Sequence, residues 1–197
     1  EKKGKQKGLG EQPERPTRIG SLFIDSGAHS LYNEHYFIND GRKRIEKPRR
    51  ERYAFFDTQE FWNYVDKYAA FIKENETAID YYVNVDVIHN PALSWRSLKY
   101  LKKEFGLNPI PVIHAGTDLK WLKRHMDNGY EFIGIGGVAQ GSTRKQYTRW
   151  ADAVFKMIGD SDGVPMVRTH GFAMTAYSSL VRYPWWSVDS ASWAKAG

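Results

Sequence analysis

The sequence predicts an α/β protein built on a parallel sheet, in the form of a (β/α)8 barrel of the TIM type. Six short apolar runs end at polar or glycine residues: 21–27, 81–88, 110–116, 132–138, 164–171 and 185–192. Helical patterns lie between these runs, at the intervals typical of strand–helix–strand units. The runs are apolar without alternation, which indicates strands that are buried on both faces.

A barrel is favoured over an open, doubly wound sheet because polar or glycine residues end so many different runs. These residues are Asp25, Asp86, His114, Gly136, His170 and Asp189. In a closed barrel the carboxyl ends of all strands converge on one axis. In an open sheet only the strands at the switch point contribute to a site. A closed barrel needs eight strands, so we expect an incomplete one, with one strand missing before residue 21 and one after Gly197.

Four segments have helical periodicity: 58–74, 93–105, 119–128 and 145–158. In the first, apolar residues recur at spacings of three and four. Asp57 or Thr58 is the expected N-cap of this helix. Gly106, Gly129 and Gly159 are the expected C-terminal stops of the other three.

Composition excludes several classes of protein. The chain has 197 residues, of which 41% are hydrophobic and 26% charged, as in an ordinary globular domain rather than a collagen-like or disordered chain. No apolar run reaches the roughly 18 residues of a membrane span, so no membrane association is predicted. The basic start lacks the apolar core of a signal peptide. Cysteine is absent, which excludes disulfides and fits a cytoplasmic location.

The net charge of +6 favours a polyanionic partner. Residues 1–18 are predicted to form a flexible basic arm, and residues 19–197 the barrel, with a basic insertion at 33–56. The insertion holds the candidate phosphate-binding residues Arg42, Lys43, Arg44, Arg49, Arg50 and Arg52. A solvated loop with no ligand is the alternative interpretation.

Two turns are candidate ligand sites. The Asp25-Ser26-Gly27 turn sets a carboxylate beside small residues, so that a flat ligand can approach the backbone. An Asp that caps a helix is the alternative. The glycine-rich stretch 134–141 has neither the dinucleotide-binding nor the P-loop spacing. We expect its N–H groups to bind a planar ligand, unless it is only a tight turn.

Asp189 lies among small hydroxyl residues and follows Trp185 and Trp186, which predicts partial desolvation and altered reactivity. A hydrogen-bonded core aspartate is the alternative. His114 and His170 are candidate metal ligands together with the carboxylates. No H-x-H or H-E-x-x-H pattern supports a metal site, so we predict none and favour structural or ligand-polarising histidines.

In this order the motifs resemble those of the tRNA-guanine transglycosylases and their phage and bacterial relatives, the DNA guanine transglycosylases. The resemblance covers about residues 20–197. The family motif D-S-G-G-[FY]-Q falls at 25–30, and the aspartate that holds the base is Asp86. G-G-L-A-V-G-E falls at 136–142, L-M-G-V-G at 169–173 and F-D-C at 188–190.

The resemblance implies that guanine in DNA is replaced by a 7-deazaguanine base of the preQ0 type through a covalent glycosyl-enzyme. Asp189 would be the nucleophile and Asp25 the general acid and base. The implied base-binding residues are Ser26, Asp86, His114, Gly136, Gly137 and His170. The duplex would have to be opened and the base flipped out.

Departures from the family pattern favour the DNA-modifying branch. His29 and Ser30 replace an aromatic residue and a glutamine, and 114–116 replaces V-Q-G. Because cysteine is absent, a zinc subdomain of the tRNA enzymes would lie outside these residues, and no cofactor is expected within them. The alternatives are the same chemistry on tRNA, a metal-dependent barrel hydrolase, and a non-catalytic nucleic-acid-binding barrel. The oligomeric state stays open, and a phage-encoded enzyme would act in the host cytoplasm.

Overall fold

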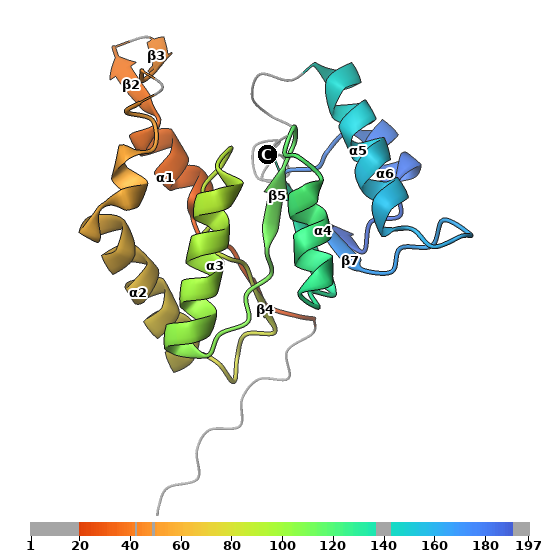
Figure 1. The fold of residues 1–197 in the computed structure, drawn as a ribbon, viewed down its shortest axis with the longest axis horizontal. Helices are drawn as coiled ribbons and strands as arrows, with labels where there is room; N and C mark the ends of the chain where they lie inside the picture. Colours follow the sequence, from red (N-terminus) through yellow and green to blue (C-terminus); the bar gives the residue numbers. More distant parts are fainter. Residues whose placement is uncertain (1–19, 42, 49, 137–142, 191–197) are drawn as a thin grey trace, which may run out of the picture.

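The computed structural model describes residues 20–41, 43–48, 50–136 and 143–190, in which parallel strands alternate with helices (Figure 1). The parallel strands are β1 (Phe23–Ile24), β4 (Tyr81–Tyr82), β5 (Val112–His114), β6 (Phe132–Gly136), β7 (Arg168–Gly171) and β8 (Ser187–Val188). Each lies within one of the six apolar runs, so the α/β class and the positions of these strands are confirmed.

The strands pair in the order in which they occur along the chain. β1 pairs with β4, and β5, β6, β7 and β8 pair in sequence, all in parallel. A parallel bridge between Val83 and Ile110 joins the two groups. The Ile110 N–H donates to the Tyr82 carbonyl over 2.9 Å, and the Asn84 N–H donates to the Ile110 carbonyl over 2.9 Å.

The sheet is strongly curved, and inner-face side chains meet across it. Phe23 on β1, the strand that pairs with β4, and His170 on β7 stack with ring centroids 4.4 Å apart. Tyr81 and Trp186 lie 5.6 Å apart, centroid to centroid. Strands four places apart in a flat sheet would be separated by about 19 Å. The carboxyl ends of distant strands are therefore close together.

The closed eight-stranded barrel is not found in the described residues. No pairing there joins β1 to β8, and the six parallel strands form an open sheet. The sequence predicts a barrel that is incomplete in this chain, and the described strands, which pair in sequence order up to β8, show no closed sheet. The barrel itself stays a prediction.

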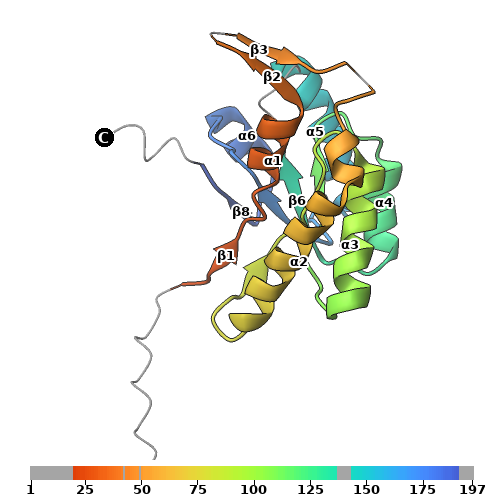
Figure 2. The same ribbon diagram turned by 90° about the vertical axis from the view of Figure 1, so that its left-hand side faces the viewer.

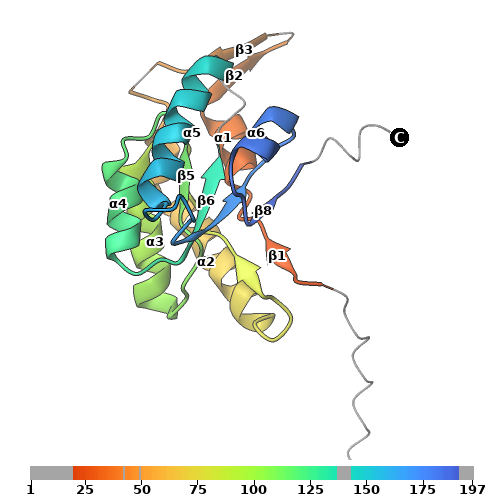
Figure 3. The same cartoon turned by 90° about the vertical axis from the view of Figure 1, so that its right-hand side faces the viewer.

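The helices are α1 (Ala28–His35), α2 (Gln59–Glu74), α3 (Pro91–Phe105), α4 (Lys120–Asp127), α5 (Arg144–Ile158) and α6 (Tyr177–Arg182). Helices α2 to α5 confirm the four predicted segments. Figure 3 shows α3, α4 and α5 along one side of the strands. Thr58, rather than Asp57, caps α2, because its side chain accepts the Phe61 N–H over 3.4 Å. Gly106 ends α3 in the left-handed conformation, with φ 65°.

The first large apolar cluster fixes α2 against the segment that follows β4. Phe61, Val65 and Ile72 pack with Val85 and Val87, and all five are buried. This packing holds the chain on either side of Asp86. A second cluster joins α4 and α5 to β5 and β6. Helix packing thus positions the strand ends where the candidate site residues lie.

Replacing Phe61 with alanine is expected to lower the free energy of unfolding by about 3–5 kcal/mol, because it leaves a cavity in a packed core. Phe61 is 1% exposed and contacts the Phe56 ring at 5.3 Å. Urea unfolding measures the change. The control is Phe71→Ala on the same helix, where the side chain is 47% exposed. Equal losses for the two variants would contradict this packing.

The basic insertion contains a structure that the sequence pattern did not predict. An antiparallel hairpin joins β2 (Phe37–Asp40) and β3 (Lys43–Glu46), and η1 (Ala54–Asp57) follows it. Figure 2 shows the hairpin projecting from the body of the protein.

The arm 1–18, Arg42, Arg49 and Gly137 lie outside the described residues. Within the described part of the chain, no helix is long and apolar enough to cross a membrane.

Candidate active site at the carboxyl ends of the strands

Three aspartates from distant parts of the chain interact at one end of the sheet. Asp25 follows β1, Asp86 follows the segment that bridges to β5, and Asp189 follows β8. Partial burial raises the pKa of Asp25 above its ordinary value, and the negative charges of Asp86 and Asp189 raise it further. The Ser26 N–H, which donates to Asp25 Oδ1 over 2.8 Å, opposes this shift without cancelling it. His170 joins the ends of β1 and β8, because its ring stacks on Phe23, two residues before Asp25, and its Nε2 lies 3.7 Å from Asp189.

The surroundings of Asp189 shift its pKa in the opposite direction, below the ordinary value. The His170 imidazole, whose Nε2 lies 3.7 Å from Oδ2, is the largest influence and lowers the pKa of this carboxyl. Partial burial acts against that shift, and the Ala173 N–H, which donates to Oδ1 over 2.6 Å, reinforces it. The side chain remains 54% exposed. Asp189 is thus an ionised carboxylate that is open to solvent.

His170 is held rigidly beside Asp189. The side chain is buried, its Nδ1 lies 2.8 Å from Ser187 Oγ, and its ring stacks on Phe23. The opposite nitrogen, Nε2, is the one that faces Asp189. Contacts on two sides therefore fix the ring orientation, which suits His170 to orienting the carboxylate.

Two non-glycine residues near the site have left-handed backbone conformations. Ala173, which follows β7, has φ 53°, and His89, in the loop after Asp86, has φ 62°. Such conformations are strained and cluster at functional sites. In Ala173 the conformation accompanies the N–H contact to Asp189. Sequence reasoning missed both residues, because a strained alanine or histidine has no distinguishing pattern.

Asp86 and His114 form a buried pair. His114 Nε2 lies 2.5 Å from Asp86 Oδ2, and the two side chains are 10% and 5% exposed. His114 Nδ1 has no hydrogen-bond partner among the described residues. Gly136 leaves room for this ring, because a Cβ there would lie 3.0 Å from Nδ1. The structure thus gives Gly136 a packing role, and the predicted contact of its amide with a ligand stays a prediction.

The Asp25-Ser26-Gly27 turn leads directly into α1. Its conformation requires glycine at the third position, because Gly27 has φ 72° and a Cβ there would lie 2.5 Å from the Tyr64 hydroxyl oxygen. That hydroxyl donates to the Ser26 carbonyl over 2.7 Å. Asp25 does not cap α1, which has no side-chain cap. Tyr64 lies in the predicted helical segment 58–74, and its hydrogen bond to this turn was not predicted.

Buried polar atoms at this end have unused hydrogen-bonding capacity. Within the described residues, Ser26 Oγ, His114 Nδ1 and His170 Nε2 have no hydrogen-bond partner. Buried polar groups normally have hydrogen-bond partners, so these atoms are suited to a polar ligand or ordered water.

A pocket of about 410 Å³ lies away from the three aspartates, and Arg168, Trp185 and Trp186 are among its lining residues. This pocket contains none of the three aspartates.

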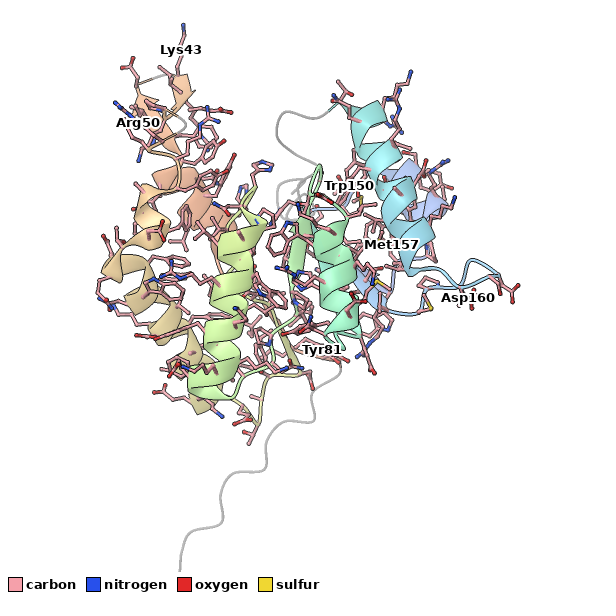
Figure 4. The ribbon with its side chains drawn as sticks, viewed as in Figure 1. Lys43, Arg50, Tyr81, Trp150, Met157 and Asp160 are labelled. Carbon is pink, nitrogen blue, oxygen red and sulfur yellow. The ribbon has the colours of Figure 1, made fainter. Side chains whose placement is uncertain are left out.

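The basic side chains of the insertion differ in how far internal contacts already occupy them. Arg52 donates to Glu46, to the Lys47 carbonyl and to the Tyr36 hydroxyl, so its guanidinium is held by internal contacts. Arg44 lies 4.1 Å from the Phe37 ring centroid and bonds to Asn33. Figure 4 shows Lys43 and Arg50 at the end of the molecule opposite Tyr81. Arg50 pairs with Glu51 but stays 87% exposed, and Lys43 is also exposed. Lys43 and Arg50 therefore suit an external anion better than Arg44 and Arg52 do.

Among the described residues, no group of three or more histidine, aspartate or glutamate side chains is arranged to hold a metal ion.

The comparisons with known proteins found no match. No family model matches the chain, and no curated protein or solved structure matches it significantly. The resemblance to the guanine transglycosylases therefore depends on the strand-end motifs alone.

Proposed function

We propose that this protein is a base-exchange transglycosylase that replaces guanine in DNA with a 7-deazaguanine base of the preQ0 type. One observation carries the proposal: His170 stacks on Phe23, two residues before Asp25, and its Nε2 lies 3.7 Å from Asp189, so the ends of β1 and β8 meet. The pKa values of the two carboxyls are shifted in opposite directions, up for Asp25 and down for Asp189. Neighbouring carboxylates with separated pKa values can divide acid and nucleophile roles.

In the proposed reaction, ionised Asp189 attacks the anomeric carbon of the sugar. The C–N bond to guanine breaks as the C–O bond to Asp189 forms, and protonated Asp25 gives its proton to the departing base. The incoming base then gives a proton to Asp25, and its nitrogen attacks the same carbon. This second step releases the Asp189 carboxylate. Both steps pass through an oxocarbenium-like state, as in retaining glycoside hydrolysis.

The base would bind between Asp86 and the Asp25 turn. His114 occupies Asp86 Oδ2, so Oδ1 is the oxygen proposed to accept from the guanine N1–H and exocyclic amine. Ser26 Oγ and His114 Nδ1 are the buried, unpartnered atoms proposed to complete the binding. The amide of Gly136 is proposed to face the base carbonyl, and Gly137, the other predicted contact, lies outside the described residues. For His170, the contact with Asp189 favours an orienting role over direct base binding.

We also propose that the curved sheet is part of a (β/α)8 barrel. Pairing in chain order, curvature across four strand positions and site residues at carboxyl ends support this assignment. A barrel places active-site residues at the carboxyl ends of several strands. The same end of the molecule carries the basic hairpin proposed to contact DNA.

The test is a base-exchange assay on duplex DNA with labelled guanine. The protein and a 7-deazaguanine base are expected to release labelled guanine in proportion to incorporation of the new base. A tRNA competitor separates the two substrate classes, because it should not suppress release if DNA is preferred. No release from DNA or tRNA with any 7-deazaguanine donor would contradict the proposal.

A further inference from the structure

The β2–β3 hairpin presents an apolar pair to solvent. Ile38 and Ile45 are directly opposite each other across the two strands, and each is 48% exposed. Opposed residues on an antiparallel pair share one face, so the two side chains form a single apolar surface. In the described structure this surface lies on a projecting hairpin rather than over the core (Figure 2).

The root of the hairpin is firmly attached. The Phe37 ring meets the Tyr32 ring edge to face at 5.4 Å and lies 5.1 Å from the Tyr36 ring. Tyr32 and Tyr36 are buried in a cluster with Ile88. The hairpin is therefore anchored to the loop after Asp86.

The root also lies close to the proposed active site. The Tyr32 ring is 5.8 Å from the His89 ring, which is 6.4 Å from the His114 ring. Burial lowers the pKa of His89, the nearby His114 lowers it further, and Glu46 of β3 acts in the opposite sense. One side chain, His89, thus connects the hairpin to the Asp86–His114 pair.

Charge indicates what the apolar pair would meet. Lys43 and Arg44 are exposed on β3, Arg50 is exposed shortly after it, and the whole chain carries +6. Lys43 lies on the same face as the apolar pair, whereas Arg44 lies on the opposite face, where it bonds to Asn33 and packs on the Phe37 ring. A cation beside an exposed apolar pair fits a polyanion with apolar stacked bases better than it fits an uncharged protein surface. Proteins that bend or open DNA commonly insert isoleucine or similar wedges between base steps, with cations on the phosphates.

We propose that the β2–β3 hairpin is a wedge that opens duplex DNA beside the active site, with Ile38 and Ile45 inserted between base pairs and Lys43, on the same face, on a flanking phosphate. This inference rests on the proposed function, because base exchange requires the target base to leave the stack. It extends that function by assigning the opening of the duplex to one named element.

The first test measures opening without chemistry. A duplex that carries 2-aminopurine beside its guanines is titrated with protein, and unstacking raises the fluorescence. The wild-type protein is expected to raise it about twofold or more. Ile38→Thr/Ile45→Thr, which keeps β-branched residues in both strands, is expected to abolish the rise. The matched control is Val164→Thr, at a side chain that is 58% exposed and outside the hairpin.

The second test compares exchange on single-stranded and duplex DNA. The double variant is expected to lose exchange on the duplex by at least about tenfold, while single-stranded exchange stays within about twofold, since a single strand needs no opening. Urea unfolding checks that the exposed substitutions leave the fold intact. Fluorescence that rises equally in wild type and double variant, or equal losses on both substrates, would overturn the wedge. Opening without exchange by the wild type would instead contradict the proposed function and leave the wedge standing.

Discussion

Replacing Asp189 with asparagine is expected to reduce guanine exchange by at least about a thousandfold, because an amide cannot supply the nucleophilic oxygen. Asp189 suits this role because His170 and the Ala173 N–H stabilise its ionised form while the side chain stays open to solvent. The loss should appear in kcat, since the substitution removes a bond formed only during the reaction.

Release of labelled guanine from the oligonucleotide measures the effect. A denaturing gel adds a second readout, because the wild type should form a covalent adduct with the oligonucleotide and Asp189→Asn should form none. The control is Asp127→Asn, at an exposed carboxylate that pairs with Lys123 at the end of α4. Exchange by Asp189→Asn at the wild-type rate would refute the nucleophile assignment.

The second large effect is expected for Asp25 and depends on pH. The proposed reaction needs Asp189 ionised and Asp25 protonated, so kcat/KM should follow a bell-shaped profile. Activity rises as pH passes the pKa of Asp189, which lies below the ordinary 3.8, and falls as pH passes the pKa of Asp25, which lies above it. Because burial and neighbouring negative charge raise the pKa of Asp25, they extend the active range upward.

Asp25→Asn is expected to lower kcat by about 10²–10⁴-fold and to remove the alkaline limb of the profile. Asp25→Glu retains a titrating carboxyl and should retain a limb, displaced according to the new position of the group. The pH profile of kcat/KM, measured for the three proteins on the same oligonucleotide, gives the answer. An unchanged alkaline limb in Asp25→Asn would assign that limb to another group.

The strands and the longer helices were predictable because their signals are local. Apolar runs that stop at polar residues located all six parallel strands, and periodicity located α2 to α5. The hairpin was missed because dense charge around Gly41 indicated a loop, although glycine at the first position of a two-residue turn is a hairpin signal. Gly41 has the left-handed conformation, φ 56°, that such a turn requires. Helix α1 is short and largely polar, so its periodicity is weak.

The site was predictable only in part. Parallel strands place their carboxyl ends at one edge, which is why Asp25, Asp86 and Asp189 were expected to meet. The pairing of Asp86 with His114 depends on the register of two neighbouring segments and on the absence of a side chain at Gly136. The Ala173 N–H contact depends on a backbone conformation. Neither is visible in a run of residue types.

The two carboxylates proposed to react come from opposite margins of the described sheet, Asp25 after β1 and Asp189 after β8. A chain still emerging from the ribosome has made the first long before the second, and the intervening strands must bend into place before the two can interact. Half-synthesised or clipped chains therefore lack the reactive pair. Under the proposed function, DNA would meet this chemistry only after folding has been completed from one margin to the other.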